Sequence, residues 1–301
     1  MGEKLGEVNF MYAIKNDFLT VVINEIGATL WSIQDKTGQE YLWQGDPKYW
    51  ADRAPNIFPY VARLTEGKYK LQGKTYEMDI HGFAKDMIFK AEQISDSSIV
   101  FSISDTEETY KQYPYHFVFS VGYRLSENKL IVTYDVKNKD DKIMYFGLGG
   151  HPGFNVPFDD DSCFEDYYLE FDDVKDAKRV GFSEDCFITG KNEAFPLEDG
   201  KRLRLKHDMF NDDAIVLTDM ARSVMLTSWK SGRAIRVTYL QMPYLGIWHR
   251  PKTDAPYICI EPWTSLPSRK GVIEELSTQP ELIALEPKRE YENHFTVSII
   301  S

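Results

Sequence analysis

The stretch FVFSVGYRLSENKLIVTYDV, residues 117–136, decides the fold class of this chain. Every second residue is apolar in its first half, and the same alternation resumes at Leu130 after Ser126-Glu127-Asn128. Apolar residues at every second position are typical of a strand that buries one face. A short polar segment between two such runs is typical of a hairpin turn. The stretch therefore predicts two antiparallel strands.

The same alternation recurs at residues 99–103 and, near the C-terminal end, at residues 295–299. Turn-forming pairs such as Ser231-Gly232 separate several of the apolar runs, which suits hairpin connections. We therefore predict an all-β fold, a large antiparallel β-sandwich with more than about 40% of its residues in strands, well above the usual share.

Helical signals are few and short. The best candidates are residues 106–112, before Tyr113-Pro114, and residues 272–277, after a glycine. No Gly/Ser-rich or Pro-rich linker interrupts the chain, so we predict a single domain over residues 1–301.

Composition narrows the function classes. The 301 residues are 43% hydrophobic, enough for a large core, and carry a formal net charge of -12. Such a charge argues against nucleic-acid and anionic-membrane partners, which need a positive surface. The three cysteines, Cys163, Cys186 and Cys259, form no C-x-x-C pair, so neither a disulfide framework nor a structural zinc site is predicted.

The chain also lacks a signal-peptide pattern and a run of about 18 apolar residues. We expect a cytoplasmic protein, a monomer or homodimer, whose partner is a small and nearly neutral molecule.

The segment GGHPGFNVPF, residues 149–158, offers the first candidate for chemistry. Its glycines allow another group to approach the backbone closely and its prolines stiffen it, so His151 lies on a shaped loop. Shaped loops often carry functional residues. The alternative is a histidine that only fills a turn.

Glu261 is the second candidate. It follows the apolar run YICI, residues 257–260, and precedes Pro262-Trp263, so the carboxylate is directed into an apolar environment. Burial disfavours the charged form and raises the pKa of a glutamate toward neutrality, the range of a general base. A structural ion pair with a basic residue is the alternative.

Three further residues could hold a polar ligand. His81 opens the segment HGFAK, and Arg63 ends an apolar segment where a buried guanidinium needs oxygen partners. Asp212 precedes a strand-like run, although turn formation also explains an aspartate there. Asp213 is adjacent, and a one-residue shift in register exchanges the faces of the two.

A metal site is not predicted, because the histidines His81, His116 and His151 are isolated in the sequence and do not show the close spacing typical of metal-binding β-sandwiches. Tryptophans could provide flat surfaces for a sugar ring, although most tryptophans in a sandwich belong to the core. The tryptophans we considered for such surfaces are Trp31, Trp43, Trp229, Trp248 and Trp263.

Six segments together resemble the aldose 1-epimerase (galactose mutarotase) family, and within it the LacX-like subgroup. The resemblance extends from about Asn9 to Ile300, with the segments in the family's order. They are FPYVARL, HGFAKDMIF, GGHPGFNVPF, NDDAIVL, PYLGIWH and CIEPW.

This resemblance implies a β-sandwich of the galactose mutarotase-like (supersandwich) type that needs no cofactor and interconverts the α and β anomers of a free hexose such as galactose or glucose. It places the general base on Glu261 and the general acid on His151. It places substrate-binding roles on Arg63, His81 and Asp212.

Two alternatives stay open at this stage. One is a hexose-6-phosphate 1-epimerase, for which Arg53, Lys85 and Arg250 could supply the cations around a phosphate. The other is a non-catalytic carbohydrate-binding protein, although such a protein has no need of both His151 and Glu261.

Overall fold

The fold follows from the alternation of apolar residues. The computed structural model describes residues 10–172, 174 and 176–301. It has 46% of residues in strands and 8% in helices, with antiparallel sheets, and this confirms the predicted all-β class. The strands are β1 (Met11–Lys15), β2 (Leu19–Asn24), β3 (Thr29–Asp35), β4 (Asn56–Ile57), β5 (Lys68–Leu71), β6 (Lys74–Glu77), β7 (Lys90–Ser95), β8 (Ser98–Ser104), β9 (Phe117–Ser126), β10 (Lys129–Asn138), β11 (Met144–Phe146), β12 (Gly149–Gly150), β13 (Gly153–Asn155), β14 (Tyr167–Phe171), β15 (Lys178–Arg179), β16 (Glu193–Ala194), β17 (Arg202–Arg204), β18 (Ile215–Thr218), β19 (Ser223–Ser228), β20 (Ala234–Thr238), β21 (Tyr244–Trp248), β22 (Tyr257–Trp263), β23 (Ile283–Leu285) and β24 (Glu290–Ile300). The helical segments are α1 (Glu107–Gln112) and the 3₁₀ turns η1 (Thr65–Gly67), η2 (Ala84–Asp86), η3 (Phe164–Asp166), η4 (His207–Phe210) and η5 (Leu276–Thr278).

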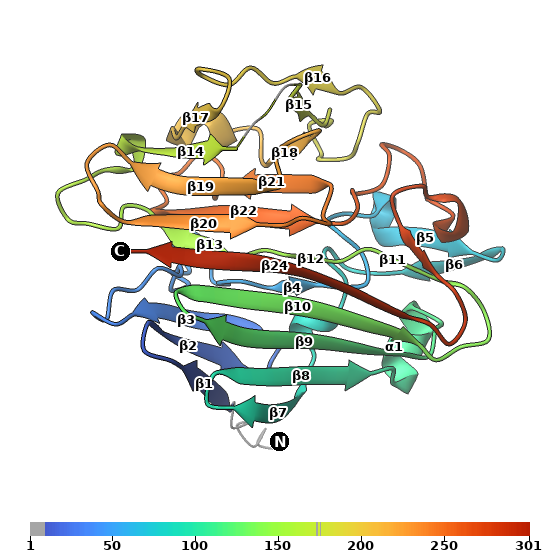
Figure 1. Ribbon diagram of the computed structural model, residues 1–301. Coiled ribbons are helices and arrows are strands. Elements are labelled where there is room, and N and C mark those ends of the chain that lie inside the picture. The colour runs from blue at the N-terminus through green and yellow to red at the C-terminus, as the bar shows by residue number, and fades with distance from the viewer. Residues whose placement is uncertain (1–9, 173, 175) are drawn as a thin grey trace, which may run out of the picture.

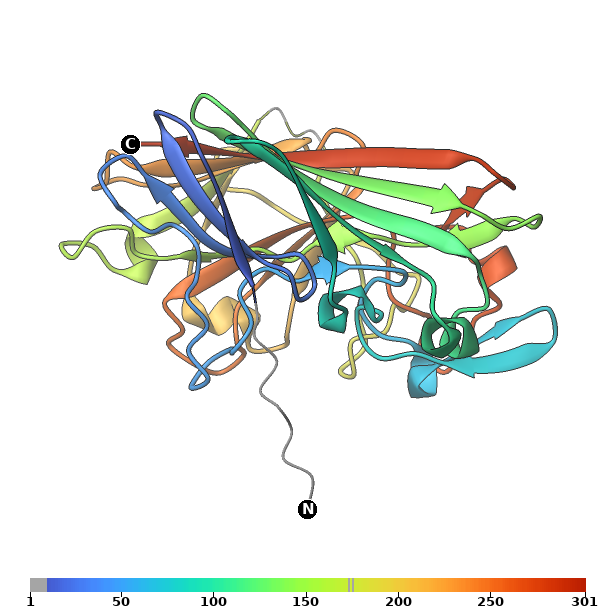
Figure 2. The same ribbon diagram turned by 90° about the horizontal axis from the view of Figure 1, so that it is seen from below.

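Two large sheets form the body of the molecule and lie as stacked layers (Figures 1 and 2). The first has nine strands in the order β17-β14-β19-β20-β24-β10-β9-β8-β7. The second follows the order β16-β15-β18-β21-β22-β12-β4, and β13 also pairs with β22. In this second sheet, most neighbouring strands are distant in the sequence, so the sheet brings together segments from across the chain.

The predicted hairpin forms the centre of the nine-stranded sheet. Strands β9 and β10 pair from Ser126 opposite Lys129 to Phe117 opposite Asn138, so Glu127 and Asn128 make the turn. Alternate residues of both strands are buried, as the sequence pattern predicts. This buried face belongs to the large apolar cluster between the layers.

Asn56 of β4 ties the two layers together. Its side chain is buried, and its Nδ2 donates a hydrogen bond to the hydroxyl of Tyr123 on β9 at 3.0 Å. Tyr134 on β10 donates its hydroxyl hydrogen to Asn56 Oδ1 at 2.9 Å. Because β4 pairs with β12 through Asn56 opposite Gly150, these bonds also fix the backbone that leads into His151.

The two predicted helices have different outcomes. The helix α1 forms close to the predicted range 106–112. Thr106 and Thr109 cap its first turn through reciprocal hydrogen bonds. The helix predicted over residues 272–277 is wrong, because only the 3₁₀ turn η5 forms there. The Glu274 carbonyl accepts a hydrogen bond from the Lys70 amide of β5 at 2.6 Å, and this pairing holds the segment extended.

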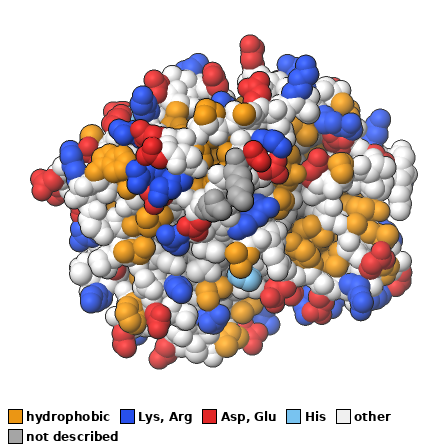
Figure 3. Space-filling view, turned by 45° about the horizontal axis from the view of Figure 1, so that its top comes forward, with side chains coloured by type: hydrophobic (Ala, Val, Ile, Leu, Met, Phe, Trp, Pro, Cys, Tyr) orange, Lys and Arg blue, Asp and Glu red, His pale blue; other side chains and the backbone are white. Residues whose placement is uncertain are grey.

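Charged side chains of both signs are interspersed on the face shown in Figure 3. Within the described residues, no helix is long and apolar enough to cross a membrane.

Candidate active site

His151 and Glu261 face each other because of strand register. Gly153 of β13 pairs with Cys259 of β22, and Gly149 of β12 keeps the same register two residues before His151. His151, in the gap between β12 and β13, therefore lies directly opposite Glu261. Its Nε2 is 3.2 Å from Glu261 Oε2, although the two groups are not aligned as a hydrogen bond. Antiparallel pairing thus places an imidazole and a carboxylate within proton-transfer distance.

Both side chains are almost completely buried, with exposures of 8% for His151 and 1% for Glu261. Burial raises the pKa of Glu261 well above its usual range, and the nearby charge of Asp213 adds to the rise. Burial also lowers the pKa of His151 to about 4. Both effects favour the neutral forms of the two groups, a protonated carboxyl and a neutral imidazole.

Aromatic rings and a glycine hold this pair in place. The imidazole of His151 packs against the indoles of Trp50 and Trp248, with ring centroids 4.9 Å and 5.7 Å away, and the two indoles also contact each other at 5.5 Å. On the other side of Glu261, Gly246 of β21 pairs with it, and a Cβ there would come within 3.2 Å of the Glu261 Cβ. The absence of a side chain at Gly246 therefore leaves the carboxylate room to take this position.

Arg63 and Asp213 form the polar wall of the site. Asp213 Oδ2 is 3.5 Å from Arg63 Nη1 and accepts a hydrogen bond from the Cys186 thiol at 3.1 Å. The backbone amide of Ala214 donates to the other carboxylate oxygen at 2.9 Å. These contacts orient one carboxylate and one guanidinium, groups that bind sugar hydroxyls well.

His81 is fixed through its backbone and its ring. Its Nδ1 accepts a hydrogen bond from the Ala62 amide at 3.3 Å, and its own amide donates to the Ala62 carbonyl at 3.0 Å. Burial, with the charges of neighbouring cations, lowers the pKa of His81 well below its usual value. The ring is therefore neutral, and the accepting role of Nδ1 places its hydrogen on Nε2, which can donate to a ligand.

One cavity of about 570 Å³ connects these groups. All five predicted residues line it, although they come from widely separated parts of the sequence. The ionisable residues that line it include Arg63, His81, His151, Asp212, Asp213 and Glu261. The structure thus brings together the five residues predicted from the sequence to have catalytic or substrate-binding roles.

The two adjacent aspartates take different positions. Asp213 makes the contact with Arg63, whereas Asp212 is exposed and lies at the cavity wall without such a partner among the described residues. A positive φ of 75° at Asp213 turns the backbone between them and directs the second carboxylate inward. The sequence pointed to Asp212 first, and the structure favours Asp213 as the better placed acceptor.

Sequence reasoning missed Trp50, which covers His151 and lines the cavity with Trp248 and Trp263. The only local signal that could have indicated Trp50 is its position shortly before residues 55–64, the segment that contains Arg63. Of the other tryptophans considered, Trp31, Trp43 and Trp229 are not among the residues that line this cavity.

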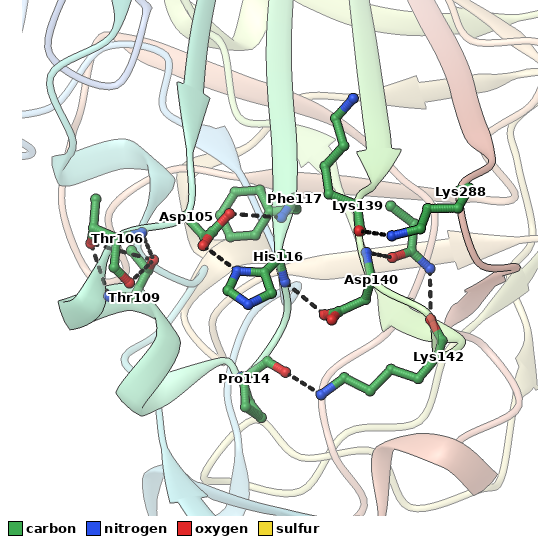
Figure 4. Close-up of polar contacts among 11 residues, drawn as sticks. Asp105, Thr106, Thr109, Pro114, His116, Phe117, Lys139, Asp140, Lys142 and Lys288 are labelled. Atoms are coloured by element: carbon green, nitrogen blue, oxygen red, sulfur yellow. Dashed lines mark hydrogen bonds and ion pairs between the residues drawn. The ribbon is translucent and has the colours of Figure 1, made fainter.

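His116 lies away from the cavity, at the start of β9 near α1 (Figure 4). Its ring Nδ1 is 2.7 Å from Asp105 Oδ2, and its amide donates to Asp140 Oδ2 at 2.7 Å. Arg53 also points elsewhere, since its guanidinium donates to the Trp31 carbonyl and lies over the Trp31 ring. Both residues therefore have structural contacts that account for them.

The family model described as "Aldose 1-epimerase" matches residues 11–298 of this chain. The chain belongs to the aldose 1-epimerase family. Protein LacX of Lactococcus lactis is a relative with 32% identity over 296 residues, which cover 96% of this chain and 99% of that protein. These matches confirm the resemblance found from the six sequence segments.

Solved structures of family members extend the comparison to the fold. A galactose mutarotase related enzyme from Lactobacillus acidophilus superposes with a TM-score of 0.92 at 34% identity, covering 97% of this chain and 98% of that chain. A galactose mutarotase-like protein from Lactobacillus casei gives a TM-score of 0.91 at 33% identity, covering 96% and 100%. The galactose mutarotase-like type of β-sandwich is thereby confirmed for this aldose 1-epimerase family member.

Proposed function

We propose that this protein is an aldose 1-epimerase that interconverts the α and β anomers of a free hexose such as galactose or glucose. The observation that carries the proposal is the buried pair of His151 and Glu261, with 3.2 Å between Nε2 and Oε2, at the wall of a sugar-sized cavity. Family membership supports an epimerase role in general.

The reaction needs one base and one acid. Glu261 takes the proton of the C1 hydroxyl while His151 gives a proton to the ring oxygen, so the bond from C1 to the ring oxygen breaks and a C1 carbonyl forms. Rotation about the C1–C2 bond presents the other face of the carbonyl. Ring closure then returns both protons, with Glu261 as the acid and His151 as the base.

The first step needs an ionised Glu261 and a protonated His151, so a proton must pass from the carboxyl to the imidazole, across the 3.2 Å between Oε2 and Nε2, when the sugar binds. After ring opening, the proton has moved to Glu261 and the imidazole is neutral, which is the state that burial favours. The buried pair therefore stabilises the open-chain sugar relative to the ring forms, and this is the direction in which the ring bond must break.

The remaining polar groups hold the sugar. His81 offers an Nε2 donor, while Arg63 and Asp213 offer a donor and an acceptor for neighbouring hydroxyls. Trp50, Trp248 and Trp263 provide flat apolar surfaces for the ring carbons. Such positioning shortens both proton paths at once and so accelerates the reaction.

The test is anomer equilibration of freshly dissolved α-galactose and α-glucose, followed by polarimetry with and without the protein. We expect the protein to increase the first-order rate of equilibration in proportion to its concentration. Sugar binding with no increase in rate for any hexose would instead indicate a carbohydrate-binding protein.

A second candidate, a hexose-6-phosphate 1-epimerase, is favoured by Lys85 and Arg250, which both line the cavity. Lys85 Nζ pairs with Asp86 at 2.5 Å, so Arg250 is the freer of the two cations for a phosphate. The same assay with glucose 6-phosphate and galactose 6-phosphate separates the candidates, since a phosphate-specific enzyme has the higher kcat/KM for the phosphorylated sugars.

A further inference from the structure

Cys259 lies directly beside the proposed acid and base. It precedes Glu261 by two residues on β22, so both side chains project from the same face of the strand. Cys259 is fully buried and carries a free thiol. The proposed anomer interconversion uses the imidazole and the carboxylate and gives this thiol no role.

The three side chains bring different ligand atoms to one point. One ring nitrogen of His151, the sulfur of Cys259 and one carboxylate oxygen of Glu261 all lie within 4.8 Å of one another. His151 Nδ1 and Glu261 Oε2 are buried and have no hydrogen-bond partner among the described residues. The site therefore presents buried, unpaired ligand atoms close to a thiol.

These distances suit a tetrahedral metal ion. Zinc binds nitrogen at about 2.0 to 2.1 Å and thiolate sulfur at about 2.3 Å, so its tetrahedral ligands are about 3.3 to 3.6 Å apart. His151 Nε2 and Glu261 Oε2 already lie 3.2 Å apart. The widest separation in the set, at most 4.8 Å, exceeds these ligand–ligand distances by about 1.2 to 1.5 Å, which small movements of the two side chains concerned would close.

The mixed set of donor atoms also selects the kind of metal. Thiolate and imidazole favour Zn²⁺ and similar ions, whereas Mg²⁺ and Ca²⁺ prefer sites made of oxygen ligands. Three protein ligands leave the fourth tetrahedral position free. His151 and Glu261 line the cavity, so this position would face it and take water.

We propose that His151, Cys259 and Glu261 form a Zn²⁺ site whose occupation inhibits the enzyme. The ion displaces the protons of the Cys259 thiol and the Glu261 carboxyl, which pass to solvent, and uses the lone pairs that His151 and Glu261 need for proton transfer. Zinc and sugar therefore exclude each other. Metal binding itself is independent of the reaction, but its inhibitory effect rests on the proposed anomer interconversion.

The experiment combines a binding readout with an activity readout. Metal-free protein is titrated with Co²⁺, a spectroscopic substitute for Zn²⁺, and with Zn²⁺ by calorimetry. Polarimetry with galactose then measures inhibition by Zn²⁺. The variants are Cys259→Ser, which removes the soft ligand at nearly constant size, and Glu261→Gln, which removes the carboxylate.

Two matched controls replace the other cysteines, Cys163→Ser and Cys186→Ser. Neither thiol belongs to the proposed set of ligands. Both variants should keep the cobalt spectrum of the parent protein, whereas loss of the spectrum in Cys186→Ser would place the metal at the wrong thiol and overturn the proposal.

We expect one Co²⁺ per chain, with intense visible bands typical of tetrahedral geometry and a thiolate-to-cobalt charge-transfer band. Zn²⁺ should displace Co²⁺, galactose should weaken Zn²⁺ binding, and Cys259→Ser and Glu261→Gln should each weaken it at least about 10-fold. If either variant fails to fold, the charge-transfer band of the parent protein still tests whether a thiolate binds the metal. The absence of this band overturns the proposal.

The readouts also separate this proposal from the proposed function. An active protein that binds no Zn²⁺ at Cys259, or that is not inhibited by it, overturns the inference about zinc and leaves the epimerase function standing. A protein that binds Co²⁺ through Cys259 but does not equilibrate any sugar supports the site and contradicts the function.

Discussion

Glu261 and His151 occupy opposing positions on neighbouring antiparallel segments, with 3.2 Å between their reactive atoms. Backbone pairing on both sides of the two residues fixes this separation. Each side chain therefore keeps its place even if the other is replaced by a residue of similar shape. The arrangement makes single conservative substitutions informative.

The first prediction concerns the base. Glu261→Gln keeps the size and one carbonyl acceptor of the side chain but cannot take a proton, so we expect kcat for anomer interconversion to fall by at least about 10². Sugar binding, measured by calorimetry, should change little. An unchanged rate of galactose equilibration would show that Glu261 has a structural role only.

The acid can be tested in the same way. In His151→Asn, the amide keeps polar atoms near the position of the ring but cannot exchange protons near neutral pH, so we expect kcat to fall by about 10² or more. Circular dichroism and the melting temperature check that the fold is intact. A variant that folds and retains more than a tenth of the parent kcat contradicts the assignment.

The two aspartates offer a matched comparison. Asp213→Asn should raise KM and lower kcat, together by about 10-fold or more in kcat/KM, because Asp213 both accepts from the ligand and orients Arg63. Asp212→Asn should have a smaller effect, since Asp212 is exposed. The reverse order of effects would restore Asp212 as the sugar-binding residue. Arg63→Ala should resemble Asp213→Asn.

Stability should depend on pH through buried histidines. Burial lowers the pKa of His249 to about 4, while its ring accepts a hydrogen bond from His207 and donates one to the Arg250 carbonyl. Between about pH 6.5 and pH 4 the unfolded chain binds a proton that native His249 does not. We therefore expect acidification through this range to lower the free energy of unfolding, by on the order of 1 to 3 kcal/mol for this histidine.

The control for this effect is His249→Phe, because phenylalanine fits beside Phe164 and Phe210 and does not titrate. Glu261 acts with the opposite sign, since its raised pKa lowers stability as pH rises above its unfolded value. Urea unfolding is therefore measured for the parent and the variant at pH 7 and pH 5. The contribution of Glu261 is the same in both proteins and cancels when their losses of stability are compared. Equal losses of stability in both proteins would contradict the role of His249.

Removal of metal ions should leave activity unchanged. The proposed proton transfers need only His151 and Glu261, so dialysis against EDTA should not lower the rate of galactose equilibration. EDTA should also reverse any inhibition by added zinc. A loss of activity that one divalent ion restores would instead make the metal part of the reaction.

Much of this protein follows from the sequence. Alternation of apolar residues over residues 117–136 predicted the central hairpin, because the two-residue period of a strand is a local property of the chain. The same logic directed attention to Glu261 at the end of an apolar strand and to His151 on a loop of glycine and proline. Local pattern failed at residues 272–277, where a hydrogen bond to β5 overrides the helical signal.

Only the tertiary structure decided how these residues meet. The register that sets His151 opposite Glu261 depends on which strands become neighbours in the second sheet, and strand order is a non-local property that no short segment encodes. The choice of Asp213 over Asp212 follows from one backbone angle, and the cover of Trp50 over His151 follows from packing between distant segments. The sequence determined which side chains were available for chemistry, and sheet pairing decided their distances, burial and pKa values.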